Sequence, residues 1–223
     1  MAVALLLRRR KEAVTFGLAH SLPISRIAER VQSHVATGIA ESRILSRSAG
    51  IEMLGAELGD VGVALEDMGA VARAQVARDI RRGNVFARNY AEQWARKAEG
   101  DTPAKAAKTA DAETLGSLRR TAVTESAEAF NDGRSRAAEE VSKTRVELLK
   151  VWDAQLDKRT CPICELADGT IVGIKESFSI GEPGAVHPWC RCTWQALTLG
   201  ERDGDAVIEP KATGKVLSFP TKP

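Results

Sequence analysis

The sequence is poor in aromatic residues and carries almost no net charge. Phe, Trp and Tyr make up 4% of the 223 residues, and 32 basic residues nearly balance 30 acidic ones, which leaves a net charge of +2. A β-sandwich usually needs more aromatic and β-branched side chains, so the alanine-rich composition favours packed helices. The small net charge excludes an overall electrostatic field for nucleic acid, and contact with DNA would need local basic patches.

No apolar run is long enough to cross a membrane, and the N-terminus does not resemble a secretory signal. The apolar residues at 2–7 are followed, not preceded, by the basic cluster Arg8–Lys11. A secretory signal has the opposite order and a longer apolar region, and a membrane helix needs about 20 apolar residues. We therefore expect a soluble protein that makes no membrane contact and is not exported by this route.

Cysteine is absent except between positions 161 and 192, where all four cysteines lie. In a reducing compartment such clustering indicates metal or redox chemistry rather than structural disulfides. Cys161-Pro-Ile-Cys164 and His187-Pro-Trp-Cys190 share the pattern ligand, proline, any residue, ligand, which places two donors at the ends of one tight turn. The proline fixes one backbone angle of each turn and reduces the entropy lost on ordering it.

The two turns together predict a structural zinc site. Cys161, Cys164, His187 and Cys190 supply three thiolates and one imidazole, a tetrahedral donor set that zinc prefers. Cys192 is an alternative fourth ligand, because residues two apart on a strand point to the same side. Two disulfides or buried free thiols are the alternative to a metal, if the protein matures outside a reducing cytosol. A zinc ion would hold together a loop-rich unit that has few apolar side chains.

Histidine is scarce, and the motifs of several enzyme classes are missing. The chain has three histidines, too few for a His-Asn-His nuclease once His187 is a structural ligand. Thr160, not proline, precedes Cys161, and neither His20 nor His34 starts a His-x-Glu motif, which argues against a zinc deaminase. No Walker-type phosphate loop occurs. We expect no enzymatic activity and no catalytic residues.

Helical periodicity dominates the first 150 residues. Ser21 and Pro23 indicate a helix start and Gly50 its end, and Thr102-Pro103 indicates another start. A break in the later helix is expected near residues 131–133, where Asn, Asp and Gly follow one another.

The most regular stretch is a heptad seam between residues 51 and 72. Apolar residues alternate steps of three and four, as in helices that pack along one stripe. Two interpretations stay open: a core face packed within the same chain, or a seam offered to a partner helix. The residues of this candidate partner-binding seam are Ile51, Leu54, Leu58, Val61, Leu65 and Met68.

These patterns predict an α+β protein with a mainly helical N-terminal body, a small C-terminal zinc-binding β module and a polar tail. Short apolar pieces among glycines and prolines after Lys150 indicate short strands and turns. The tail is expected to be extended or disordered unless a partner orders it. The expected divisions are a basic lead-in over 1–20 that is disordered or weakly helical, a helical region over 21–117, a module over 118–197 and the tail over 198–223.

The order of motifs between residues 118 and 196 resembles the phage Mu F-type minor head protein family, also called the phage head morphogenesis domain. A helix with Asn and Gly-Arg is followed by a Trp, then Arg-x-Cys-x-x-Cys at 159–164, Leu-x-x-Gly at 166–169 and His-Pro-Trp-Cys-Arg-Cys at 187–192. Each short motif arises easily by chance, whereas the whole order is far more specific. The residues that match the helical motif are Arg120, Glu125, Asn131 and Arg134, whose roles in the fold or toward a partner are open.

The resemblance implies a minor structural component of a tailed-phage head or related particle, acting in head assembly and DNA packaging near the portal. By this analogy the partners are the portal protein, the major capsid protein or both, and packaged DNA touches local basic patches. Several copies per particle, a place in the head interior or at the portal vertex, and a host-cytoplasmic assembly stage follow from the same analogy. The helical region would dock on the portal or capsid.

A zinc-bearing nucleic-acid-binding protein is the alternative function. It would use the cluster Arg8–Lys11 and the basic pairs Arg81-Arg82 and Arg119-Arg120. Binding through several phosphates weakens steeply as the salt concentration rises, whereas docking of an apolar seam changes little. Salt dependence therefore separates the two hypotheses.

Overall fold

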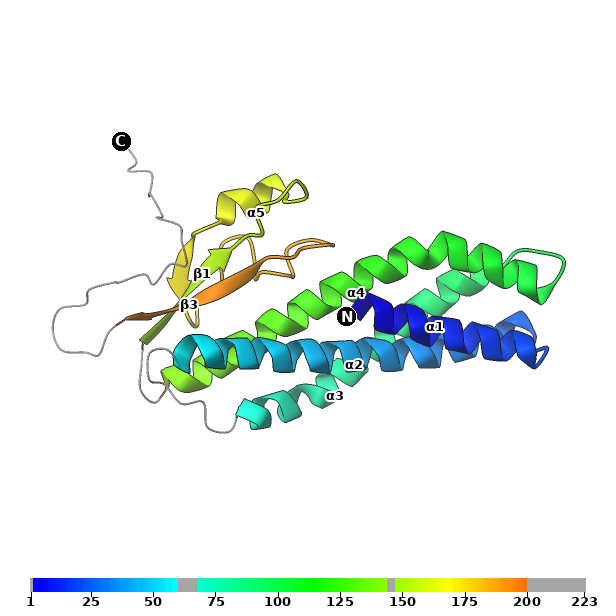
Figure 1. Ribbon diagram of the computed structural model, residues 1–223, viewed down its shortest axis with the longest axis horizontal. Helices are drawn as coiled ribbons and strands as arrows, with labels where there is room; N and C mark the ends of the chain where they lie inside the picture. The colour runs from blue at the N-terminus through cyan, green and yellow to red at the C-terminus, as the bar shows by residue number, and fades with distance from the viewer. Residues whose placement is uncertain (1, 60–67, 144–146, 200–223) are drawn as a thin grey trace.

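Four long helices form an elongated body, and a small three-stranded sheet packs near one end of it (Figure 1). The computed structural model describes residues 2–59, 68–143 and 147–199. The chain is α+β and mainly helical, as the sequence predicts. Its elements in chain order are α1 (Ala2–Ala19), α2 (Ile24–Gly59), α3 (Met68–Lys97), α4 (Pro103–Ser142), β1 (Glu147–Asp153), α5 (Pro162–Ala167), β2 (Ile171–Gly173) and β3 (Thr193–Leu199).

The two proline-marked helix starts are confirmed. Helix α2 begins at Ile24, directly after Pro23. Helix α4 begins at Pro103, and the Thr102 side chain accepts a hydrogen bond from the Lys105 backbone N–H at 3.3 Å. Proline is tolerated in the first turn because the missing N–H would have no helical partner there.

The N-terminal lead-in is a regular helix, not a disordered or weakly helical segment as expected. Leu6 and Ala13 of α1 are fully buried, in the same apolar cluster as Ile27 and Val31 of α2. The expectation is wrong because the apolar residues of α1 are too few to form a helix alone, and α2, the next helix of the chain, supplies their packing surface.

Two glycines that the sequence suggested as breaks instead let α2 and α4 cross closely. Helix α2 continues past Gly50 to Gly59, and α4 runs unbroken through 131–133. A Cβ atom at Gly133 would lie 2.7 Å from the Arg47 carbonyl oxygen, and one at Gly50 would collide with the Phe130 carbonyl. The expected helix end and the expected break are therefore wrong, because here glycine is needed for a close approach and not for a turn.

The heptad seam belongs to the core of the chain itself. Ile51, Leu54 and Leu58 are 5%, 0% and 1% exposed, and their cluster includes small residues of α4 and the tryptophans of the sheet. The partner-binding interpretation is wrong for these three residues, because their apolar faces are already covered. Val61 and Leu65 lie outside the described residues, as does the side chain of Met68.

The expected boundary between the helical region and the module falls inside α4, which runs unbroken across residues 117 and 118. The sheet has the order β2-β1-β3 with antiparallel pairs, and Trp152 of β1 faces Trp194 of β3 in the register. Both tryptophans share one core cluster with the end of α2 and of α4. The module is thus packed onto the helical body rather than separate from it.

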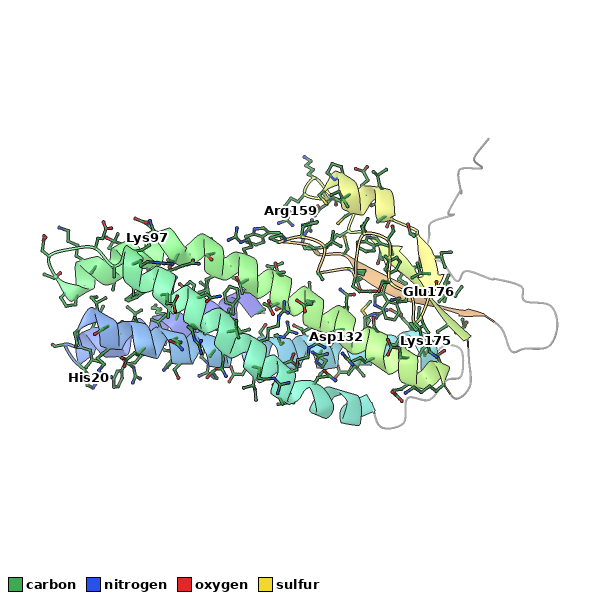
Figure 2. All side chains as sticks on the ribbon, turned by 180° about the vertical axis from the view of Figure 1, so that it is seen from behind. His20, Lys97, Asp132, Arg159, Lys175 and Glu176 are labelled. Atoms are coloured by element: carbon green, nitrogen blue, oxygen red, sulfur yellow. The ribbon has the colours of Figure 1, made fainter. Side chains whose placement is uncertain are left out.

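A buried network of charges joins α2, α3 and α4. Asp79 of α3 is fully buried and accepts hydrogen bonds from Arg43 Nε at 2.9 Å and Arg47 Nη2 at 2.8 Å. Arg43 also reaches Glu125 of α4, and Arg47 reaches Asp132. Figure 2 shows Asp132 on the body, well away from the far end where His20 and Lys97 lie. The network fixes the register of the three helices, because each charge is satisfied only in this arrangement.

Replacement of Asp79 by Asn is expected to lower the free energy of unfolding by about 3–5 kcal/mol. The substitution keeps the side-chain shape but removes the carboxylate between the buried guanidiniums of Arg43 and Arg47. Chemical denaturation followed by helical circular dichroism measures the loss. Glu113→Gln is the matched control, because the ion pair of Glu113 with Lys97 is exposed and contributes little. Equal, small effects of both substitutions would contradict the role given to the network.

Candidate metal centre

The first cysteine turn is the start of α5. Cys161 caps the helix, and its Sγ accepts a hydrogen bond from the Cys164 backbone N–H at 3.4 Å. Pro162 takes the first helical position, where it costs no hydrogen bond. The short spacing within one turn brings the sulfurs of Cys161 and Cys164 to the same side of the helix start.

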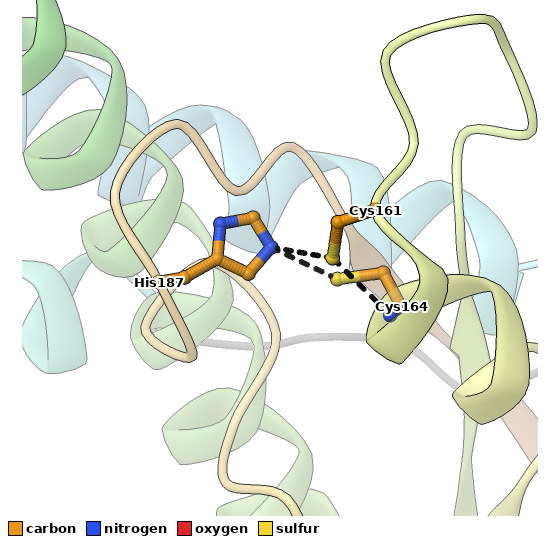
Figure 3. Close-up of side chains that lie close together, drawn as sticks. All are labelled: Cys161, Cys164 and His187. Carbon is orange, nitrogen blue, oxygen red and sulfur yellow. Dashed lines mark hydrogen bonds between the residues drawn. The ribbon is translucent and has the colours of Figure 1, made fainter.

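The imidazole of His187 faces these two sulfurs (Figure 3). Its Nε2 lies 3.1 Å from Cys161 Sγ and 3.2 Å from Cys164 Sγ, while its Nδ1 lies 2.8 Å from the Pro188 carbonyl oxygen. A carbonyl oxygen can only accept, so Nδ1 carries the proton of the neutral ring and Nε2 keeps its lone pair. A metal-ligating histidine is held in this way, with one nitrogen donating to the protein and the other free for the metal.

A second group of donors shares Cys164 with the first. The sulfurs of Cys164, Cys190 and Cys192 lie within 4.8 Å of one another, and Cys164 Sγ is 3.9 Å from Cys190 Sγ. All four cysteines are free thiols. The structure therefore brings the five donors named from the sequence into one cluster. Both Cys190 and Cys192 are within reach of Cys164, so the choice of a fourth ligand stays open.

The buried part of this cluster has opposed thiol pKa values. Burial raises the pKa of Cys164 to about 12. The hydrogen bond between Cys190 and Cys192 lowers the pKa of Cys190 to about 5 and, together with burial, raises the pKa of Cys192. A metal bound here would take these sulfurs as thiolates, and its positive charge would offset the burial that otherwise keeps Cys164 and Cys192 protonated. Thiolate and imidazole are the donors that zinc and other thiophilic metals take.

A comparison with protein families extends the resemblance noted for the C-terminal part. Residues 12–195 match the family model described as phage Mu protein F like protein. The chain belongs to this family. Comparisons with curated proteins and with solved structures give no match. The matched range of the phage Mu F-like family begins within α1 and ends within β3, so it covers the helical body as well as the metal centre.

Two of the four residues of the phage Mu F-like helical motif connect α4 to the strand behind the metal centre. The Asn131 side chain donates to the Cys192 carbonyl at 3.1 Å and accepts from the Thr193 hydroxyl at 2.8 Å. Arg134, fully buried, donates to the Trp194 carbonyl at 2.9 Å. These contacts are internal to the fold.

The other two motif residues lie elsewhere on α4. Glu125 is part of the buried charge network, where Arg43 and Arg82 donate to its carboxylate. Arg120 is exposed, and its side chain has no ion pair among the described residues. Of the four motif residues, Arg120 is thus the one whose side chain makes no ion pair within the described part of the chain.

Sequence reasoning missed two residues of the helical body, one of which holds the second cysteine turn and the other β3. The Thr124 hydroxyl accepts from the Trp189 backbone N–H at 3.1 Å, and Glu57 of α2 accepts from Arg134 at 2.7 Å and from the Ala196 N–H at 3.3 Å. Trp189 has a φ of 69°, a conformation that residues other than glycine rarely adopt. No local pattern marks these residues, since a Thr or Glu on a helix is ordinary until its tertiary partner is known.

Asn131→Ala is expected to weaken the attachment of β3 to α4. It leaves the buried Cys192 carbonyl without the amide donor and the Thr193 hydroxyl without its acceptor, at a cost of about 1–3 kcal/mol. Hydrogen exchange of the β3 amides and chemical denaturation measure the effect. Asn84→Ala, at an exposed position within α3, is the control and should leave β3 exchange unchanged. Unchanged β3 protection in Asn131→Ala would contradict the assignment.

Proposed function

We propose that the protein is a minor structural protein of the head of a tailed phage or related particle, and that it acts in head assembly and DNA packaging near the portal. Family membership over residues 12–195 is the observation that carries this proposal. The partners in this proposal are the portal protein, the major capsid protein or both, and the protein is present in several copies in the head interior or at the portal vertex. Assembly takes place in the host cytoplasm.

A structural Zn²⁺ ion braces the C-terminal module in this proposal. Cys161, Cys164, His187 and Cys190 hold the ion, with Cys192 as the alternative to Cys190. The convergence of Cys161 and Cys164 on Nε2 of His187, whose Nδ1 faces the Pro188 carbonyl, supports the site. The ion contributes folding energy, and four protein donors leave no coordination position for an activating water. We propose no enzymatic activity for this chain.

The packing of the module explains why a metal brace would matter to the helical body. Cys164, Cys190 and Cys192 belong to the same buried cluster as Leu54 and Leu58 of α2. Loss of the metal would loosen the two cysteine turns and expose this shared core, because the coordination bonds that tie both turns to one ion would be lost. The zinc would therefore stabilise the end of the helical body as well as the module.

The nucleic-acid-binding alternative has less support. Its N-terminal basic cluster is largely occupied by ion pairs within the body, since Arg9 pairs with Glu41 at 2.6 Å and Arg10 with Asp111 at 3.5 Å. Within the described ranges no helix combines the length and apolar composition of a membrane span. Because the basic cluster is paired within the body, a protein surface of the assembling head is the partner that we propose first.

Cys164→Ser is expected to abolish stoichiometric zinc binding, because Cys164 belongs to both donor groups. Zinc content by mass spectrometry, on full-length protein purified under reducing conditions, measures the loss. Cys190→Ser and Cys192→Ser form a matched pair. The substitution that removes the fourth ligand should lower the zinc content nearly as much as Cys164→Ser does. The other substitution should leave the zinc content unchanged. Full zinc content in Cys164→Ser would contradict the site.

Co-expression with the portal and major capsid proteins of the same phage tests the assembly function. The full-length protein is expected to co-purify with assembled heads and to stay bound at high salt. If it remained in the soluble fraction and instead bound duplex DNA with an affinity that falls steeply with salt, the nucleic-acid-binding alternative would be supported. The zinc content measured in parallel separates failure of the metal site from failure of head association.

A further inference from the structure

A groove runs over the face of the body between α3 and α4. It consists of two adjoining hollows of about 450 Å³ and 290 Å³ that share Phe86, Asn89 and Glu125 in their walls. Residues 78–93 of α3 line one side, residues 117–125 of α4 line the other, and Pro188 of the second metal-site turn closes one end. We call this surface the α3–α4 groove.

The centre of the α3–α4 groove is apolar. Phe86 lines both hollows, the buried ring of Tyr90 lines the smaller one, and Val85 stands beside them with 62% of its surface exposed. Val85 is the most exposed of the large apolar residues described on α1–α4. An apolar strip at the bottom of a hollow favours a ligand that can bury apolar side chains of its own.

The charges along the α3–α4 groove are mainly positive. Arg78, Arg81, Arg82 and Arg120 line it, against the single carboxylate of Glu125.

That carboxylate is already neutralised, because Arg82 donates to both of its oxygens at 2.8 Å and 3.1 Å and Arg43 donates to it from within the body. Arg81 and Arg120 are exposed and have no acidic partner in the part of the chain that the structure describes. The charge left for a ligand is therefore positive, and a complementary ligand is acidic.

We propose that the α3–α4 groove binds an acidic amphipathic helix of a protein partner. The apolar face of that helix packs on Val85 and Phe86, and its carboxylates approach Arg81 and Arg120. The lining stretch of α3 spans roughly 22 Å, the length of about four helical turns. Docking of an amphipathic helix in an apolar groove with charged rims is a recurring mode of recognition.

A protein helix fits this surface better than nucleic acid does. A phosphate backbone would pair with Arg81 and Arg120 but would leave Val85 and Phe86 uncovered, because it offers no apolar side chains. Arg82 is paired with Glu125 and Glu128 and adds little free charge for either kind of ligand. The smaller hollow borders the second metal-site turn at Pro188, but Arg81, Val85 and Arg120 all lie on the helices, so the groove can be tested in solution on the purified protein.

Fluorescence anisotropy with full-length protein tests the proposal. The probe is a labelled 18-residue synthetic helix with leucines on one face and glutamates on the other. A peptide of the same composition with scrambled order and a 20-base-pair DNA duplex are the comparison probes. At physiological salt we expect the helix to bind and the scrambled peptide to bind at least about tenfold more weakly.

Reversing the charge of two arginines at the groove rim tests whether the helix binds in the groove. The double substitution Arg81→Glu, Arg120→Glu is expected to weaken binding of the helix about tenfold, and Val85→Ser should weaken it as well. Arg88→Glu is the matched control, because Arg88 is an exposed arginine of α3 outside the groove lining. Circular dichroism confirms that each variant is folded.

Three results would overturn the proposal: no binding of the helix, equal binding of the scrambled peptide, or equal losses from the rim and control substitutions. Tight DNA binding that the rim substitutions alone remove would assign the groove to nucleic acid instead. These binding measurements do not depend on whether the protein enters phage heads. The head-assembly function and the groove proposal can therefore fail separately.

Discussion

The attachment of α4 to the strand behind the metal centre is the contact on which the rest of the arrangement depends. Asn131 donates to the Cys192 carbonyl and accepts from the Thr193 hydroxyl, and Arg134 donates to the carbonyl of Trp194 in β3. The last two cysteines are therefore placed by the helical body and not by the module alone. A metal bound at these cysteines would stabilise the packing of α4 as well as the module, because Asn131 and Arg134 tie α4 to β3.

The close crossing of α2 and α4 makes that attachment possible. Gly50 and Gly133 bring the two backbones together, and the buried charge network of Arg47, Asp79 and Asp132 joins α2, α3 and α4 there. Such a network gives little net stability compared with an apolar core, but it penalises every other register of the helices. We infer that its main contribution is to the geometry of the body, which in turn places Arg134 and Glu57 against β3.

The sequence contained enough information for the metal donors and the fold class, but not for the packing of the body. Two matched turns with a proline each identify four of the five candidate donors, and Cys192 follows from its place two residues after Cys190, because these signals are local. Gly50 and the stretch 131–133 were misinterpreted as breaks, because a glycine that permits close approach has the same local signature as one that ends a helix. Asp79 gave no signal at all, since a lone charged residue on a helix is normally exposed. Its role depends on Arg43 and Arg47, more than thirty positions earlier in the chain.

Thermal unfolding of the full-length protein with and without a zinc chelator, together with its zinc content, tests the central claim most directly. The account predicts one zinc ion per chain and a lower melting temperature after chelation, seen in the helical signal as well as in the tryptophan fluorescence of the module. Protein that contains no metal, forms disulfides among its cysteines and melts at the same temperature with and without the chelator would contradict it.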